Sequence, residues 1–297
     1  MPESNVSGSL PLRLAPLLIG LVAVAGYMVY GCQEGPFGRK RVITLSEKDE
    51  EQLGAQAFKE VLQKEVVIDG GPAVDRVEEI GRNLARAAED PELLKLINLK
   101  PRKFDWQFRV VRSKQVNAFC LPGGKVVVYT GILPVCETDA GLATVMGHEI
   151  GHALARHGAE RMAQQQMVGI GQQAAAATLG GSDPQTQQKI MAVLGAGSNV
   201  GILLPFSRSH ESEADHIGIL LMARAGYDPR EAVKFWQRME KATGAGKSPE
   251  FMSTHPSHDR RIHDLREKWL PDAMRIYEDS RPHRESLQLP GVRGAEE

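Results

Sequence analysis

The stretch Thr144-Val145-Met146-Gly147-His148-Glu149-Ile150-Gly151-His152-Ala153-Leu154 places a His-Glu-x-x-His pattern among residues that favour a helix. Because a helix turns once every 3.6 residues, His148 and His152 lie on one face, one turn apart. Two imidazoles at this spacing can bind one Zn²⁺, and the carboxylate of Glu149 can reach a water on that metal. This short pattern therefore predicts two metal ligands and a general base.

The alternative is a helix whose histidines are ordinary polar residues. The neighbouring residues are apolar, so the helix is expected to be buried: Ala143, Val145, Ile150, Ala153 and Leu154. Two histidines and a glutamate in a buried helix would be costly without a partner. A metal ion is the partner that satisfies all three side chains together.

The composition of the chain limits the other possibilities. The 297 residues suffice for one large or two small domains, and the formal net charge of -1 gives no reason to expect a nucleic-acid partner. Three cysteines do not make a disulfide framework. The chain contains no Cys-x-x-Cys, so metal ligands must come from histidine and glutamate.

The N-terminal region predicts a membrane tether. Residues 14–33 carry no charge and are long enough to cross a bilayer as a helix, although a buried core helix is an alternative. The segment could be an uncleaved anchor, or a lipoprotein signal in which Cys32 is lipidated after Val29-Tyr30-Gly31. The basic run 39–41 follows the segment, so the positive-inside rule alone would place the rest of the chain in the cytoplasm, whereas a signal would place it outside.

The remaining pattern predicts an α+β fold. Helical periodicity covers residues 45–65 and 72–89. Alternating apolar and polar residues predict strands at 104–110, 117–121 and 125–129, the last two joined as a hairpin by Pro122-Gly123-Gly124. We expect a small antiparallel sheet packed on the active-site helix, 138–158.

The second half of the chain is predicted to be helical. Helices are expected at residues 160–178, 184–197, 206–225, 229–243 and 257–268, the last continuing loosely past Pro271. Residues 159–204 could form a mobile flap, a lipid-facing surface or a hairpin that merely packs. The predicted domains are an N-terminal signal or anchor at 1–33, a metallopeptidase domain at 34–275 and a disordered tail at 276–297.

A catalytic zinc usually has three protein ligands and one open position, so a third ligand must come from elsewhere. A metzincin would need glycine at 155 and histidine at 158, but these positions are Ala155 and Gly158. That class is excluded. His157 falls off the metal-facing stripe, and we interpret it as a helix-end group or as support for a ligand.

A second helix offers the third ligand. Glu211 and Asp215 are four residues apart and share a face, so Glu211 can bind zinc while Asp215 orients a ligand histidine. The alternative for this pair is an exposed acidic face. Glu213 points elsewhere and is predicted to face solvent.

Five segments carry a resemblance: NAFCLPGG (117–124), VYTGIL (128–133), HEIGHALARH (148–157), SRSHESEADHIG (207–218) and THPSHDRRI (254–262). Over residues 45–270 the chain resembles the zinc metalloendopeptidase family of the CAAX prenyl protease and HtpX. Its compact form with one anchor is similar to the periplasmic, BepA-like branch.

The resemblance implies a role for each matching residue. It implies one Zn²⁺ per chain bound by His148, His152 and Glu211, with Glu149 as the base and Asp215 supporting a ligand. It also implies that His255 and Arg261 face the scissile carbonyl and that Asn117 binds the substrate backbone. From the residues alone, His255 would be a loop residue, Arg261 a charge on a helix surface and Asn117 a turn residue.

These observations predict a mostly helical α+β domain of the gluzincin type that hydrolyses peptide bonds. A peptide substrate would add to the sheet edge as an extended strand over the zinc. The resemblance implies a membrane-anchored enzyme of the cell envelope, on the periplasmic side, that acts in protein quality control. The alternative is an envelope chaperone or assembly factor with a latent zinc site. A purely structural zinc is a weaker alternative, because structural zinc sites usually have four protein ligands. Cys120 and Cys136 could pair or remain as small apolar groups.

Overall fold

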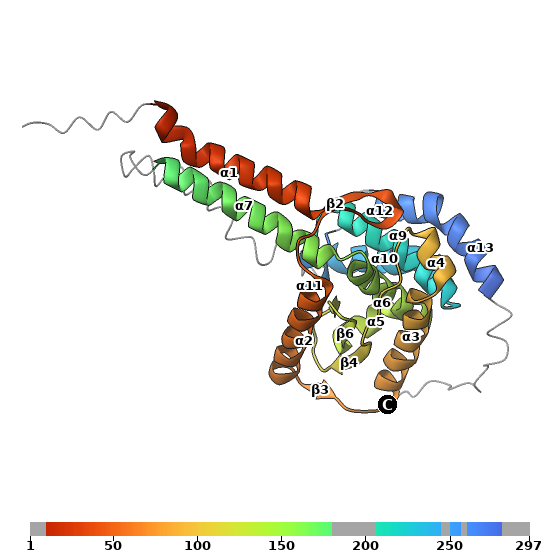
Figure 1. Cartoon of the computed structure of the whole chain (residues 1–297). Coiled ribbons are helices and arrows are strands. Elements are labelled where there is room, and N and C mark those ends of the chain that lie inside the picture. The colour runs from red at the N-terminus through yellow and green to blue at the C-terminus, as the bar shows by residue number, and fades with distance from the viewer. Residues whose placement is uncertain (1–9, 180–205, 245–249, 257–259, 281–297) are drawn as a thin grey trace, which may run out of the picture.

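The computed structural model describes residues 10–179, 206–244, 250–256 and 260–280. Figure 1 shows a helical body around a small sheet, from which two helices extend together. The mostly helical α+β class predicted from the sequence is confirmed. Among the described residues, the helices of the body are α2 (Glu47–Lys64), α3 (Pro72–Ala88), α4 (Pro91–Leu96), α5 (Leu133–Cys136), α6 (Asp139–Leu154), α9 (Arg208–Arg224), α10 (Arg230–Gly244), α11 (Glu250–Thr254), α12 (Arg261–Asp264) and α13 (Leu270–Ser280).

Helix α6 forms the centre of the body. The Thr138 side chain accepts a hydrogen bond from the backbone N–H of Gly141. Asp139 occupies the first turn, where its negative charge interacts favourably with the helix dipole. Almost every residue of α6 is buried. The expected helix at 138–158 ends at Leu154, because Arg156 adopts a left-handed backbone conformation (φ 55°) before α7 (His157–Leu179) begins. This break turns His157 back toward α6.

Helix α9 packs directly against α6. A Cβ atom on Gly218 would lie 2.9 Å from the backbone nitrogen of His148, and one on Gly147 would lie 3.0 Å from the Gly218 carbonyl oxygen. Only glycine allows the two backbones to approach this closely. The contact brings the acidic residues of α9 beside the two histidines of α6.

The four-stranded sheet has the order β3-β4-β6-β5 and consists of β3 (Val67–Ile68), β4 (Gln107–Val111), β6 (Lys125–Tyr129) and β5 (Ala118–Leu121). The predicted β5–β6 hairpin is confirmed and turns at Gly123 and Gly124, both with positive φ. The sheet is not wholly antiparallel, because β4 pairs in parallel with β6. The connection from β4 crosses to the far side of β6, which leaves β5 at the sheet edge.

Two long helices run side by side away from the body, α1 (Leu10–Gly31) and α7 (Figure 1). The contact is close: a Cβ atom on Gly20 would collide with that of Ala174. The Tyr27 hydroxyl donates to Gln166. Most of α1 is exposed and apolar, and Leu14–Gly31 is long and apolar enough to cross a membrane. The cavity beside α6 is lined by α7 only near its start, at Gly158, Ala159 and Arg161, among the described residues.

A short hairpin joins α1 to the body. It consists of β1 (Cys32–Glu34), the turn η1 (Pro36–Gly38) and β2 (Lys40–Val42), which pair antiparallel. The ring of Phe37 stacks on His216 of α9 with centroids 4.0 Å apart. The hairpin is therefore packed onto the body.

The C-terminal helical region continues past Pro271, as expected. It runs through α12, a π-helical turn η3 (Leu265–Trp269) and α13. A separate short turn, η2 (Thr130–Ile132), lies between β6 and α5. Residues 276–280, predicted to be disordered, form the end of α13. The helix expected at 184–197 lies outside the described residues.

Candidate metal centre

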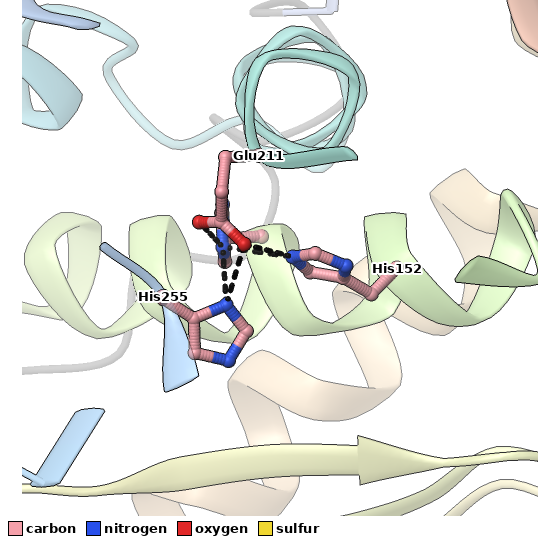
Figure 2. Close-up of side chains that lie close together, drawn as sticks. His152, Glu211 and His255 are labelled. Atoms are coloured by element: carbon pink, nitrogen blue, oxygen red, sulfur yellow. Dashed lines mark hydrogen bonds and ion pairs between the residues drawn. The ribbon is translucent and has the colours of Figure 1, made fainter. Parts of the chain in front are cut away.

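Four buried side chains from three elements converge beside α6. His148 and His152 come from α6, Glu211 comes from α9, and His255 directly follows α11. One ligand atom of each lies within 4.8 Å of the others, and each residue is at most 4% exposed. Figure 2 shows His152, Glu211 and His255 pointing toward one common position.

The distances between the donors are short. The two Nε2 atoms of His148 and His152 lie 3.1 Å apart. Oε1 of Glu211 lies 3.4 Å from Nε2 of His152 and 3.1 Å from Nδ1 of His255. A single ion at the common position would therefore contact all four groups.

The outer nitrogens of the two α6 histidines face other partners. Nδ1 of His148 lies 2.9 Å from the Asp215 carboxylate, and Nδ1 of His152 lies 2.9 Å from Nδ1 of His157. Protons on these outer nitrogens leave both Nε2 lone pairs directed inward, where they face each other and the Glu211 carboxylate. Lone pairs gathered in this way need a cation between them, so the donor set fits a metal ion.

The ionisation of the site supports the same conclusion. Burial opposes a charge on His148, but hydrogen bonds to Asp215 and Glu211 outweigh it and raise its pKa to about 9. Burial lowers the pKa of His152 well below its usual value. In the metal-free chain the carboxylates therefore favour a positive charge at His148, and a metal ion would replace the proton on its Nε2. His152 is already in the neutral form that binds a metal.

Glu149 lies next to the donor set and faces a cavity of about 230 Å³. Its Oε1 makes no hydrogen bond within the described residues and lies 3.5 Å from Nε2 of His255. Burial raises the pKa of its carboxyl, although the charges of His255 and His148 oppose this. A buried carboxylate of raised pKa that faces a cavity can accept a proton.

The edge strand β5 forms one wall of the same cavity. Residues 117–122 line it together with Glu149, His152 and His255. Asn117 immediately precedes β5; its side chain accepts a hydrogen bond from the Ala118 N–H, and its carbonyl accepts one from Tyr129. The predicted substrate-binding position therefore lies at the cavity, on a strand with a partner on only one side.

His255 lines the cavity beside Glu149 and also joins the donor set, which the sequence did not predict. Its Nδ1 belongs to the donor set, 3.3 Å from Nε2 of His148. The ring is held by stacking on Phe251, with centroids 4.5 Å apart. With His255 included, the set has four protein donors instead of the expected three.

Arg261 also lies elsewhere than expected. It is fully buried, does not line the cavity, and extends over the ring of Trp236 at 3.8 Å. Its guanidinium donates to Asp215 and Glu211. The two buried carboxylates of α9 attract this cation inward. Arg261 therefore contacts Asp215 and Glu211 and does not face the cavity.

Sequence reasoning missed a second buried polar group. Glu213 was predicted to face solvent, yet it is 7% exposed and accepts a hydrogen bond from Nε2 of His157 at 2.8 Å. Of the two interpretations of His157, the structure favours the one in which His157 supports a metal ligand, because its Nδ1 lies 2.9 Å from Nδ1 of His152. The sequence carries no signal for this arrangement, because nothing in it marks the left-handed break at Arg156 that turns His157 back toward α6.

The cysteines that could have paired do not. Cys120 lies on β5 and Cys136 at the end of α5, and both are free thiols. The disulfide alternative is therefore wrong, and Cys136 is a small buried apolar group.

Comparison with known proteins places this site in a family. The family model "Peptidase family M48" matches residues 76–269, a range that contains the complete donor set and Glu149. The chain belongs to peptidase family M48. Proteases of this family are metal-dependent, in agreement with the buried donor set.

Curated relatives come from two settings. The chain is 46% identical over 169 residues to the mitochondrial metalloendopeptidase OMA1 of Schizosaccharomyces pombe, covering 57% of this chain and 48% of that protein. It is 36% identical over 259 residues to the same enzyme of Saccharomyces cerevisiae, with 82% and 70% covered. The beta-barrel assembly-enhancing protease of Yersinia pestis is 33% identical over 170 residues, with 55% and 34% covered. The chain thus spans about half the length of the S. pombe protein, and of the Y. pestis protein it covers a smaller part.

Proposed function

We propose that this member of family M48 is a zinc-dependent endopeptidase. The observation that carries the proposal is the position of Glu149: a buried carboxylate of raised pKa stands between a four-donor set and a cavity walled by an open strand edge. This arrangement supplies a proton acceptor, a metal position and a place for an extended peptide.

The donor set favours zinc among the common metals. Three imidazole nitrogens and one carboxylate oxygen in a buried group suit Zn²⁺ better than Ca²⁺ or Mg²⁺, which prefer oxygen ligands. Zinc held by His148, His152 and Glu211 would polarise a peptide carbonyl and make water more acidic. Asp215 would fix the ring of His148 through its outer nitrogen.

The chain's own residues would then carry out the proton transfers. Glu149 would accept the proton of the attacking water and return it to the leaving amine. The substrate would add to β5 as a strand, and Asn117 at the start of β5 would fix its register. The partner is therefore a protein or peptide segment in extended conformation.

His255 must move for this reaction. Four protein donors are typical of a structural zinc site, whereas a catalytic site keeps one position open. His255 is the donor best able to leave, because it follows a helix of five residues, while the other three stand on long buried helices. The described arrangement thus corresponds to a closed form of the site.

The set of four donors, with His255 in place, is also the observation that favours a second candidate function. A chaperone or assembly factor with a latent zinc site would keep His255 in place permanently. The two proposals differ in one measurable property, namely whether the metal-loaded chain cleaves a peptide.

We further propose that α1 is retained as a membrane anchor in the cell envelope, with the body on the periplasmic side. The close contact between Gly20 and Ala174 supports retention, because a removed signal would leave that face of α7 uncovered. The lipoprotein alternative requires cleavage before Cys32, which is exposed at the start of β1. The intact mass of membrane-extracted protein distinguishes these: loss of residues 1–31 with an added lipid would refute the anchor. A reporter fused after Gln33 that is active only in the cytoplasm would refute the periplasmic side.

The experiment for the catalytic proposal uses the full chain in detergent micelles with casein as substrate. We expect one zinc per chain, cleavage that stops when a chelator removes the metal, and recovery when zinc is restored. Zinc bound at full stoichiometry without any cleavage would refute the endopeptidase and favour the latent site. Cleavage that persists after complete zinc removal would refute the metal-dependent mechanism.

A further inference from the structure

A row of polar groups, all buried except the half-buried Arg39, connects the hairpin after α1 to His152. Arg39, between η1 and β2, donates two hydrogen bonds to Glu160 of α7, at 2.8 and 2.7 Å. It also donates to Glu213 of α9 at 2.9 Å. Glu213 accepts from Nε2 of His157, and Nδ1 of His157 lies 2.9 Å from Nδ1 of His152. The row therefore ends at a candidate metal ligand.

The direction of the hydrogen bonds follows from the acceptor at one end. Glu213 can only accept, so Nε2 of His157 carries the ring proton. Nδ1 of His157 then offers a lone pair and accepts from Nδ1–H of His152. This places the proton of His152 on its outer nitrogen and leaves its Nε2 free to bind a metal.

The row is built as a buried structure. Glu160 and Glu213 are 4% and 7% exposed, and His157 is fully buried and stacks on His210 with centroids 4.4 Å apart. Buried carboxylates need a cation, and the planar guanidinium of Arg39 contacts both of these, while Glu160 also lies 3.2 Å from Nε2 of His210. Glu213 and His157 together support His152, just as Asp215 supports His148 directly.

We propose that Arg39 is a positioning residue for His152, acting through Glu213 and His157. The hairpin that follows the N-terminal helix is thereby part of the machinery that holds the metal. The inference rests on the proposed function only in taking His152 as a metal ligand. It concerns a group outside the His-Glu-x-x-His pattern and more than a hundred residues before it in the chain.

The test compares Arg39→Gln with Lys40→Gln in the full chain. Lys40 is its neighbour in the same hairpin and loses the same charge, but it pairs with Glu34 at the surface, 71% exposed. Zinc affinity is measured by competition with a chelator, and the ring tautomers of His152 and His157 by ¹⁵N NMR of the zinc-free protein. We expect Arg39→Gln to weaken zinc binding by about 10-fold or more and to mix the His152 tautomers. Lys40→Gln should change neither.

A double-mutant cycle tests the route. If Arg39 acts through Glu213, the losses of zinc affinity in Arg39→Gln and Glu213→Gln will not add, and the double variant will resemble the weaker single variant. Additive losses would overturn the proposed route, and zinc affinity within twofold of wild type in Arg39→Gln would overturn the role of Arg39. If Arg39→Gln does not fold, Arg39→Lys replaces it, because a lysine keeps the charge but cannot bridge both carboxylates; unchanged affinity and tautomers in that variant would also overturn the proposal. Wild-type protein that binds no zinc would instead refute the proposed function.

Discussion

Arg261 donates a hydrogen bond from its Nε to the carboxylate of Asp215 at 2.6 Å, with both side chains fully buried. The same guanidinium donates to Glu211. One guanidinium thus balances two carboxylates. Glu211 belongs to the donor set, and Asp215 faces the outer nitrogen of His148. The relationship links the stability of the fold to the geometry of the site.

Replacing Arg261 should therefore destabilise the protein strongly. Arg261→Met keeps most of the side-chain volume but leaves two buried carboxylates without their cation, so we expect a loss of about 3–5 kcal/mol in the free energy of unfolding. Arg82→Met, which removes an exposed pair with Glu78, should cost less than about 1 kcal/mol. Urea denaturation of the zinc-free protein measures both. Equal losses in the two variants would show that the buried pair has no special role.

Asp215→Asn should weaken metal binding. The amide keeps the size of the carboxylate but loses the charge that holds the Nδ1 proton of His148, so we expect zinc affinity to fall by about 10–100-fold. Asp90→Asn is the matched control, because Asp90 pairs with Arg224 of α9 away from the site and asparagine caps a helix equally well. Competition with a chelator gives the affinities. An unchanged affinity in Asp215→Asn would remove its role in orienting His148.

His255→Ala should separate metal binding from turnover. Removing the fourth donor lowers zinc affinity, and we expect a loss of about 10-fold, but it also opens a coordination position. The rate of casein cleavage at saturating zinc should consequently rise. A variant that binds zinc but loses cleavage would show that His255 takes part in the reaction and does not merely close the site.

His216 predicts a pH dependence of stability. Burial between the rings of Phe37 and Trp269 lowers its pKa to about 4, although the charge of Asp272 opposes this. The unfolded chain therefore binds more protons than the folded chain below pH 6.5, so the stability due to neutral His216 is present above pH 6.5 and is lost as pH falls to about 4. The loss is at most about 3–4 kcal/mol.

The variant His216→Phe keeps the stacking but cannot take up a proton. Its unfolding free energy, measured in urea from pH 7 to pH 4, should decrease less steeply than that of the wild type. Parallel curves for the two proteins would contradict the assignment.

The sequence predicts the parts of the site that follow from local periodicity. His148 and His152, and likewise Glu211 and Asp215, are spaced by one helical turn, so their common faces are fixed before any tertiary contact is known. The β5–β6 hairpin is predictable for the same reason, because its glycines mark the turn.

The parts that the sequence does not determine depend on contacts between distant segments. Whether His255 lies over the substrate or within the donor set depends on how α11 meets α9, and the buried position of Glu213 depends on Arg39 from the N-terminal hairpin. The parallel pairing of β4 with β6 likewise reflects where the connecting chain crosses the sheet. Local patterns carry no information about these positions.

The central claim is that Glu149 transfers protons beside a bound zinc, and Glu149→Gln tests it most directly. The amide fills the same space but cannot accept a proton, so kcat/KM for peptide cleavage should fall by about 10²–10⁴-fold. Because Glu149 is not in the donor set, the variant should still bind one zinc per chain with wild-type affinity. Loss of cleavage with zinc retained is the predicted result, and wild-type turnover by the zinc-loaded variant would contradict the account.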